Sequence, residues 1–393
     1  MTIAYLFDLN LCTRMAHDVY LVKTCHSLAE AGERIYLLAG RTEVPEDEIW
    51  SYYGRVAHPG LTLVQVPRLH RRSIPLPFLQ RLRISHTGIF NYFCSLALRR
   101  ISRAERLDLV VVGGLKPAEL YLRHQRRLRV PYIYEVHRLF SKDYPTRETA
   151  ALERKILEQA CCLVVTTSAL ERILRTEYGL AHKVIRKVPL ATDLALFDPS
   201  SSGGAVSQRP RLCYFGQLYP LQGVELLIES LRYLPDASLQ IIGGNPPGDL
   251  ERLRAWGQAL GVANRVLFHG FVTPRRLVEF VQAHADILVI PTRSGGRMSY
   301  VAHTKVYEYL ALGKPIVAAR LPSVEEVLAD GRNAVLVEPD DAKMLARGIQ
   351  RVIDDPELAR GVSNQASVDA RQYSWQNRAQ LLISIFSQMA PSN

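Results

Sequence analysis

Short apolar segments alternate with longer amphipathic ones along both halves of the chain. Each segment has the length and the β-branched or aromatic content of a strand, and each gap is long enough for a crossover helix. This alternation predicts a parallel sheet with crossover helices in each half, an α/β fold of two Rossmann-like, doubly wound domains. The predicted strands lie within 2–8, 34–40, 61–67, 107–114, 131–137, 161–168 and 183–190, then within 211–218, 238–244, 265–272, 285–292, 314–320 and 333–339.

One segment interrupts the alternation near the middle of the chain. Residues 198–210 have no hydrophobic periodicity and are rich in Ser, Gly and Pro, which is typical of a linker. A length of 393 residues also suits two domains better than one. We predict domains over 1–198 and 210–372, a linker over 199–209, and a separate terminal segment over 373–393.

Composition narrows the class of protein. Hydrophobic residues make up 48% and charged residues 22%, and no apolar run is long enough to span a bilayer. Asp8, Arg14 and Asp18 interrupt what would have to be the apolar core of a signal peptide, so we expect a cytoplasmic protein. The six cysteines form no C-x-x-C pair and lie in no metal-ligand spacing with histidines, so we expect free thiols and no metal site.

The net charge of +11 is concentrated in the first half. Between Arg55 and Arg129 there are fifteen basic and three acidic residues, so an anionic partner is expected there. Within this region, residues 76–106 alternate arginines with large apolar residues. Such a segment fits peripheral contact with the anionic inner face of a cell membrane, or a core-facing helix with arginines on its wet side. No nucleic-acid-binding motif accompanies the charge, so nucleic acid is not an expected partner.

Glycine-bearing turns follow the strands of the second half. Gly216 and Gln217 end one strand and lead through Gln222 into a helix, and Gly243 ends the next strand. A turn of this type lets backbone N–H groups and a helix N-terminus approach a phosphate, although it can also be only a tight turn. Because ligands of open α/β sheets bind at the carboxyl ends of strands, these turns define one candidate site.

A second group of polar residues follows the strand within 285–292. Thr292 ends that strand, Arg297 lies in the next loop, and Lys305 and Glu308 come one helical turn apart. A carboxylate close to a helix start can accept two vicinal ribose hydroxyls, and the lysine can meet a phosphate. The alternative for Glu308 is a solvated helical glutamate.

Taken in order, several motifs resemble those of the retaining GT-B glycosyltransferases of family 4, or group 1. They are Gly216-Gln217-Leu218 with Gln222-Gly223, Phe268-His269-Gly270-Phe271, residues 285–291, residues 308–317 and Tyr373-Ser374-Trp375. The resemblance covers about residue 209 to the C-terminus well and the first half loosely. It implies two facing Rossmann-like domains with a deep interdomain cleft, and transfer of a sugar from a UDP or GDP sugar to a hydroxyl acceptor. The acceptor would be a saccharide, a lipid-linked saccharide or a small molecule, and the reaction would need no cofactor or metal.

The resemblance also implies roles for individual residues. Glu308 matches the acid that holds the donor ribose, the backbone at Phe271 matches the segment that grips the nucleobase, and His137 matches a cleft-facing catalytic histidine. Residues 373–389 resemble a terminal helix that returns to the first domain. The catalytic residues expected are therefore His137 and Glu308, and those expected to bind the donor are Gly216, Gln217, Gln222, Gly243, Phe271, Thr292, Arg297, Lys305 and Glu308.

The sequence departs from the family pattern at three places. Gln217 and Gln222 occupy the positions of a basic pair that neutralises the diphosphate, Tyr300 replaces an acid, and residues 8–13 lack the usual Gly-Gly. Glutamine can donate hydrogen bonds but cannot offset charge, so the diphosphate is neutralised by Lys305, Arg297, Arg293 or backbone amides, or not at all. Two alternatives therefore stay open, a catalytically inactive relative that binds a partner or sugar nucleotide, and a nucleotide-sugar epimerase.

Overall fold

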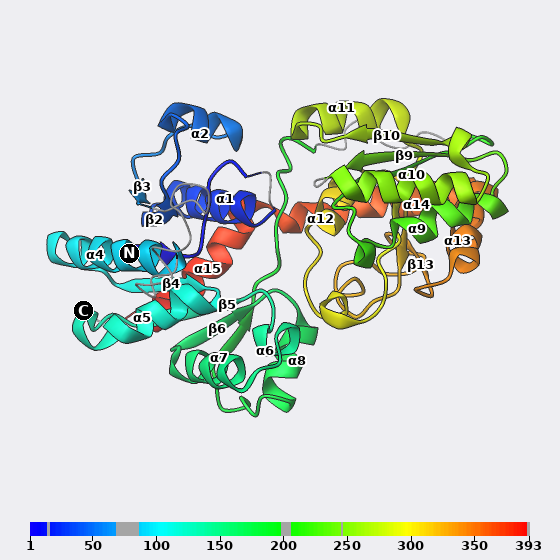
Figure 1. Cartoon of the computed structure of the whole chain (residues 1–393). Helices are drawn as coiled ribbons and strands as arrows, with labels where there is room; N and C mark the ends of the chain where they lie inside the picture. Colours follow the sequence, from blue (N-terminus) through cyan, green and yellow to red (C-terminus); the bar gives the residue numbers. More distant parts are fainter. Residues whose placement is uncertain (14–15, 68–85, 198–205, 245–246, 391–393) are drawn as a thin grey trace, which may run out of the picture. The chain divides into compact units, whose positions relative to one another are not determined.

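The computed structural model describes residues 1–13, 16–67, 86–197, 206–244 and 247–390, and Figure 1 draws the whole chain. The chain forms two compact units. The N-terminal unit contains residues 1–166 and 170–189 together with the last segment from Trp375, and the C-terminal unit contains 167–169 and 190–374. Part of the predicted linker, residues 199–205, lies outside the described residues, as do residues 76–85 of the predicted basic segment.

The N-terminal unit is built on a seven-stranded parallel sheet in the order β3-β2-β1-β4-β5-β6-β7. Its central strands are buried along their whole length, which is why their sequences are almost uniformly apolar. All seven strands predicted for this half are confirmed. They are β1 (Thr2–Leu6), β2 (Arg34–Gly40), β3 (Leu61–Val66), β4 (Leu109–Gly113), β5 (Tyr132–Val136), β6 (Cys162–Val165) and β7 (Ile185–Lys187).

Helices cover both faces of this sheet. The strand order reverses between β1 and β4, so right-handed crossovers place α1 on the opposite face from α5 and α7. The last helix of the chain, α15, packs beside α1, and α4 packs beside α5. The helices are α1 (Ala16–Glu30), α2 (Glu46–Tyr52), α4 (His86–Ala104), α5 (Leu115–Leu128), α6 (Phe140–Asp143), α7 (Arg147–Gln159), α8 (Ser168–Thr176) and α15 (Trp375–Met389).

The C-terminal unit is built on a six-stranded parallel sheet in the order β10-β9-β8-β11-β12-β13. All six strands predicted for this half are confirmed, and the order again reverses at the centre, between β8 and β11. In sheets with such a reversal, ligands bind in the crevice at the carboxyl ends of the two strands that flank it. The strands are β8 (Arg211–Gly216), β9 (Ser238–Gly243), β10 (Val266–Gly270), β11 (Ile287–Ile290), β12 (Ile316–Ala319) and β13 (Val335–Val337).

Helix α9 packs against α10 and α13, whereas α12 packs against α14. One core cluster joins the sheet to α9 and α13 and includes Leu227, Ile241 and Ile349. The helices are α9 (Val224–Ser230), α10 (Pro247–Ala259), α11 (Pro274–His284), α12 (Thr304–Ala311), α13 (Ala342–Asp354) and α14 (Pro356–Ala370), with 3-10 turns η1 (Pro220–Gln222), η2 (Leu231–Tyr233), η3 (Ala263–Arg265), η4 (Gly296–Ser299) and η5 (Arg371–Tyr373).

Two details differ from the sequence-based expectation. Residues 190–197 belong to the C-terminal unit, because Thr192 pairs with Ser374 and its N–H donates to the Tyr373 carbonyl at 2.8 Å. Glu308 is not at a helix start, because α12 already begins at Thr304 and contains both Lys305 and Glu308. Among the described residues, no helix is long and apolar enough to cross a membrane.

Candidate functional site

The crevice of the C-terminal unit is shaped by three glycines with positive φ. Gly216 ends β8 with φ 139°, Gly243 ends β9 with φ 124°, and Gly223 precedes α9 with φ 71°. A Cβ on Gly243 would lie 2.0 Å from the Gly216 carbonyl oxygen, and a Cβ on Gly223 would lie 1.9 Å from the Pro291 carbonyl oxygen. Only glycine lets the ends of β8, β9 and β11 approach so closely.

Lys305 projects from the first turn of α12 into this crevice. It is 8% exposed, and its Nζ donates to Tyr214 Oη at 2.8 Å and to Gln222 Oε1. Burial lowers the pKa of the Lys305 ammonium to about 7, although the Glu308 carboxylate acts in the opposite direction. A Cβ on Gly216 would lie 3.4 Å from Lys305 Cε and 3.3 Å from Tyr214 Oη, so the glycine backbone lies directly beside the lysine. Burial therefore disfavours the charged form of Lys305, and a bound anion would favour that charged form again.

A chain of contacts links this lysine to the loop at η4. Gln222 is 5% exposed and donates from Nε2 to Tyr219 Oη at 2.6 Å, and the Arg297 guanidinium lies 6.0 Å from the centre of the Tyr219 ring. The predicted donor residues Gln222, Lys305 and Arg297 are thus brought together. Gln217 is half-buried, and its carbonyl accepts from Tyr214 Oη.

The loop itself is anchored by a buried histidine. His303 Nε2 lies 3.0 Å from the Met298 carbonyl oxygen and 3.2 Å from Ser323 Oγ. Burial is the main cause that lowers the pKa of His303 to about 4, and the charge of nearby Lys305 also lowers it. The imidazole is therefore neutral near pH 7 and holds η4 by hydrogen bonds without adding charge.

The other predicted donor residues are distributed around the crevice. Glu308 is half-buried and acts electrostatically on Lys305, whereas Phe271 follows β10 with 45% of its surface exposed. Thr292 exposes no surface and therefore presents nothing to a ligand in this structure. Arg293, one of the candidates for neutralising phosphate, lies 3.7 Å from Asp340 and is already paired. Tyr300, at the position of the missing acid, is buried at 5% exposure.

His137 lies in the N-terminal unit, directly after the carboxyl end of β5. Its side chain is 28% exposed, and its Nε2 is 3.3 Å from Glu135 Oε2. Sequence reasoning missed Glu135, whose only signal is a carboxylate inside an otherwise apolar strand. Within the part of the chain that the structure describes, no group of three or more His, Cys, Asp or Glu residues is arranged to hold a metal ion.

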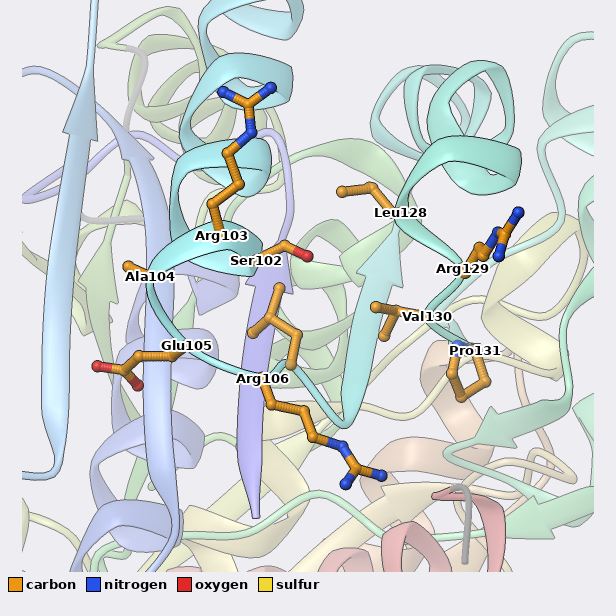
Figure 2. Close-up of a pocket in the computed structure, with 10 residues that line it drawn as sticks. Ser102, Arg103, Ala104, Glu105, Arg106, Leu128, Arg129, Val130 and Pro131 are labelled. Carbon is orange, nitrogen blue, oxygen red and sulfur yellow. The ribbon is translucent and has the colours of Figure 1, made fainter. Parts of the chain in front are cut away.

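A second feature of the N-terminal unit is a basic face on α4 and the loops before β4 and β5. A cavity of about 490 Å³ opens there, lined by residues 102–107 and 128–131. Figure 2 shows Arg103, Arg106 and Arg129 around this cavity, with side chains that point in different directions and do not converge on one point. The cations therefore cover an area of surface and do not surround one small ligand.

Comparisons with known proteins agree with this architecture. Residues 200–368 match the family model of glycosyl transferases group 1, and residues 17–191 match that of the glycosyl transferase 4-like domain. The chain belongs to the group 1 glycosyltransferases. Its two parallel-sheet domains have the GT-B type of fold, since the structure of sucrose-phosphate synthase from Thermosynechococcus elongatus matches with a TM-score of 0.80, at 20% identity over 99% of both chains.

Curated relatives within this family carry different names. A D-inositol 3-phosphate glycosyltransferase from Acidothermus cellulolyticus is 32% identical over 60% of this chain, and the match spans only 54% of that relative. An MMP alpha-(1->4)-mannosyltransferase from Mycolicibacterium hassiacum is 25% identical over 94% of this chain and 93% of the relative. Anabaena HepE, solved in complex with UDP-glucose, matches with a TM-score of 0.72 at 15% identity, over 99% of this chain and 100% of HepE.

Proposed function

We propose that this group 1 glycosyltransferase is a retaining enzyme that moves a sugar from a nucleoside diphosphate donor, a UDP or GDP sugar, to a hydroxyl acceptor. The observation that carries the proposal is the buried Lys305 beside Gly216 at the carboxyl ends of β8 and β11. The hydrogen-bond partners of this ammonium are neutral, and burial disfavours its charge. It is therefore suited to an anionic ligand. The backbone of the glycine turns can approach the same anion.

The diphosphate would be neutralised differently from the family pattern. Lys305 and Arg297 would take the place of the basic pair. Gln222 accepts from Lys305, and Tyr219, which Gln222 contacts, has its ring near Arg297. Arg293 is unsuited because Asp340 already pairs with it. Glu308, one turn after Lys305, would accept the ribose hydroxyls, and Phe271 and its backbone would meet the base.

The proposed reaction breaks the bond between the anomeric carbon and the donor diphosphate oxygen. The acceptor hydroxyl oxygen forms the new bond on the same face of the sugar, and its proton passes to a phosphate oxygen of the departing diphosphate. Preorganised cations stabilise the charge that develops on that diphosphate, so we expect no requirement for Mg²⁺. His137 would hydrogen-bond the transferred sugar or the acceptor, since an imidazole can donate or accept near neutral pH.

The relatives support a small or envelope-associated acceptor without choosing between them. Two are named for D-inositol 3-phosphate and MMP, and another matching structure is a lipopolysaccharide outer core galactosyltransferase. We therefore keep a saccharide, a lipid-linked saccharide and a small molecule as candidate acceptors. A cytoplasmic enzyme with peripheral contact to the inner face of the membrane would reach all three.

The exposed face of α4 supports the membrane contact. Tyr92 is 59% and Leu96 40% exposed, and both share a helix face with Arg99 and Arg103. Exposed apolar side chains beside cations fit the interface of an anionic bilayer. The double variant R103E/R106E should lose sedimentation with phosphatidylglycerol vesicles, whereas R275E/R276E, on α11, should sediment as the wild type does. Equal sedimentation of the two variants would refute the contact.

The donor site is tested by calorimetry with UDP, GDP, ADP, dTDP and CMP, each with and without Mg²⁺. We expect one diphosphate to bind equally well in both conditions and K305Q to bind it more weakly. Binding by none of the five would favour the inactive-relative alternative, for which Gln217, Gln222 and Tyr300 are the evidence. Conversion of a nucleotide sugar without any acceptor would favour an epimerase.

A further inference from the structure

A buried charged cluster lies beneath His137 in the N-terminal unit. Glu135 is 2% exposed on β5, Arg378 is 2% exposed on α15, and Tyr20 is 4% exposed on α1. Burying a carboxylate and a guanidinium is costly unless both are paired and hydrogen-bonded. Three separate elements therefore contribute to one polar cluster inside an apolar core.

The contacts within the cluster fix the Glu135 carboxylate. Tyr20 Oη donates to Oε2 at 2.7 Å, and Arg378 Nη2 lies 3.4 Å from Oε1. Arg378 Nη1 in turn donates to the Val188 carbonyl at 2.9 Å and to the Pro189 carbonyl. Burial alone would raise the pKa of Glu135, but the hydrogen bonds from His137 and Tyr20 and the charge of Arg378 lower it. The carboxylate is therefore ionised and has little freedom to turn.

His137 is the member of this cluster that reaches the surface. Its Nε2 lies 3.3 Å from the same Glu135 Oε2 that Tyr20 contacts, and its ring stands edge-on to the Tyr20 ring at 4.9 Å. Phe7 and His17 flank the ring at 6.4 Å and 6.2 Å. With 28% of its side chain exposed at the end of β5, the imidazole lies where ligands of such sheets bind.

We propose that Glu135 is a positioning residue that sets the orientation and protonation of His137, and that Tyr20 and Arg378 hold Glu135 for that task. The inference rests on the proposed function, in which His137 contacts the sugar or acceptor. By accepting from Nε2–H, the carboxylate selects one tautomer and directs Nδ1 to the ligand. The last helix of the chain thereby takes part in organising this histidine, through a contact between residues 243 positions apart.

Replacing Glu135 with glutamine removes the negative charge beside the His137 ring. Among the described residues, the ionisable groups around the His137 ring are Glu135, Tyr20, Arg378, His17 and the adjacent Arg138. Glu135 is the one anion among them, so it stabilises the imidazolium. In E135Q the imidazolium loses that stabilisation while the side-chain shape is kept. The amide that replaces the carboxylate can also donate to Nε2, so His137 should lose its preference for the tautomer that carries the proton on Nε2.

The first test follows ¹⁵N-labelled histidine side chains by NMR in the full chain. The signal that is absent from H137N assigns His137. We expect its ring nitrogens to lose their preference for one tautomer in E135Q. E158Q is the matched control, because Glu158 lies 3.1 Å from His182 in the same unit, and only His182 should respond. An unchanged His137 signal in folded E135Q would overturn the proposal.

Y20F provides a milder second variant. It removes the hydroxyl that donates to Glu135 but keeps the ring against His137, so the protein should fold. We expect a smaller shift of the same His137 signal, and an unaltered signal would count against the proposed role of Tyr20 and Arg378 in holding the carboxylate.

Kinetics then separate this inference from the function on which it rests. Donor turnover by E135Q should show a reduced kcat with nucleotide affinity unchanged. If H137A turns over donor as well as the wild type does, the role of His137 in transfer fails even though the NMR result stands. If H137A is impaired but E135Q keeps the wild-type kcat, the role of Glu135 fails.

Discussion

If the donor diphosphate binds beside Lys305 as proposed, the burial of this lysine makes that binding depend on pH in a specific way. Its pKa of about 7 in the unliganded site means that about half of the molecules carry the charge at pH 7 and about a tenth at pH 8. A bound diphosphate would restore the pKa towards its ordinary value of about 10.4. Binding should therefore take up about 0.1 proton at pH 6, about 0.5 at pH 7 and about 0.9 at pH 8. Above pH 8, affinity should fall about tenfold for each further pH unit until the bound form also titrates.

Calorimetry in two buffers of different ionisation enthalpy measures this uptake directly. At pH 8 the terminal phosphate of the nucleotide, with a pKa of about 6, is already deprotonated and contributes nothing. His303 is also silent, since its pKa of about 4 keeps it neutral throughout. K305Q should bind more weakly, take up no proton and show no change of affinity between pH 7 and pH 9. Absence of uptake by the wild type at pH 8, or equal uptake by K305Q, would refute the role of Lys305.

The same shift makes a prediction about stability. Between pH 7 and about 10 the unfolded chain holds a proton on Lys305 that the folded chain has released. The free energy of unfolding of the C-terminal unit should therefore rise with pH through this window and stay low below it. K305Q should lack that rise, which urea denaturation at several pH values can measure.

Three further predictions concern the same crevice. G223A should lower the stability of the C-terminal unit by about 2–4 kcal/mol in denaturant melts, because its Cβ would lie 1.9 Å from the Pro291 carbonyl oxygen at a φ of 71°; a melt like that of wild type would contradict this packing. R297A should weaken the binding of the nucleoside diphosphate about tenfold in calorimetry and spare the bare nucleoside, since one charge-assisted contact is lost; an equal loss for both would exclude a phosphate role. E308A should weaken binding of the ribonucleotide at least tenfold more than that of its 2′,3′-dideoxy analogue; an equal loss for the two forms would place Glu308 away from the ribose.

The fold could be predicted almost completely from the sequence. Strands buried on both faces must be apolar throughout, and the intervening amphipathic lengths leave few topologies other than two parallel sheets. The domain boundary was less accessible, because residues 190–197 join the C-terminal unit through backbone pairing of Thr192 with the segment at Ser374. Such pairing joins residues far apart in sequence and leaves no local pattern.

The crevice proposed to bind the donor could be predicted only in part. Strand ends of a parallel sheet meet at one edge, so the sequence brings Gly216, Gly243 and Lys305 together. It does not show that Gln222 bonds Lys305, since glutamine in a 3-10 turn is usually a surface residue and its burial depends on Tyr214 and Tyr219. It also does not show that Thr292 is fully buried.

The cluster under His137 was inaccessible for a different reason. Glu135 and Arg378 meet only when the last helix packs beside α1. An isolated carboxylate in an apolar strand shows that a partner must exist, but it does not show which of many distant cations supplies it. Tertiary packing decides that choice.

The most direct measurement of the central claim is turnover of the nucleotide sugar itself. NMR of wild-type protein with the donor whose base binds should detect release of the nucleoside diphosphate and formation of a sugar product that keeps the donor's anomeric configuration. K305Q should form that product much more slowly, and Mg²⁺ should not be needed. Tight donor binding with no bond cleavage, or a product of inverted configuration, would contradict the proposal that this chain is a retaining glycosyltransferase.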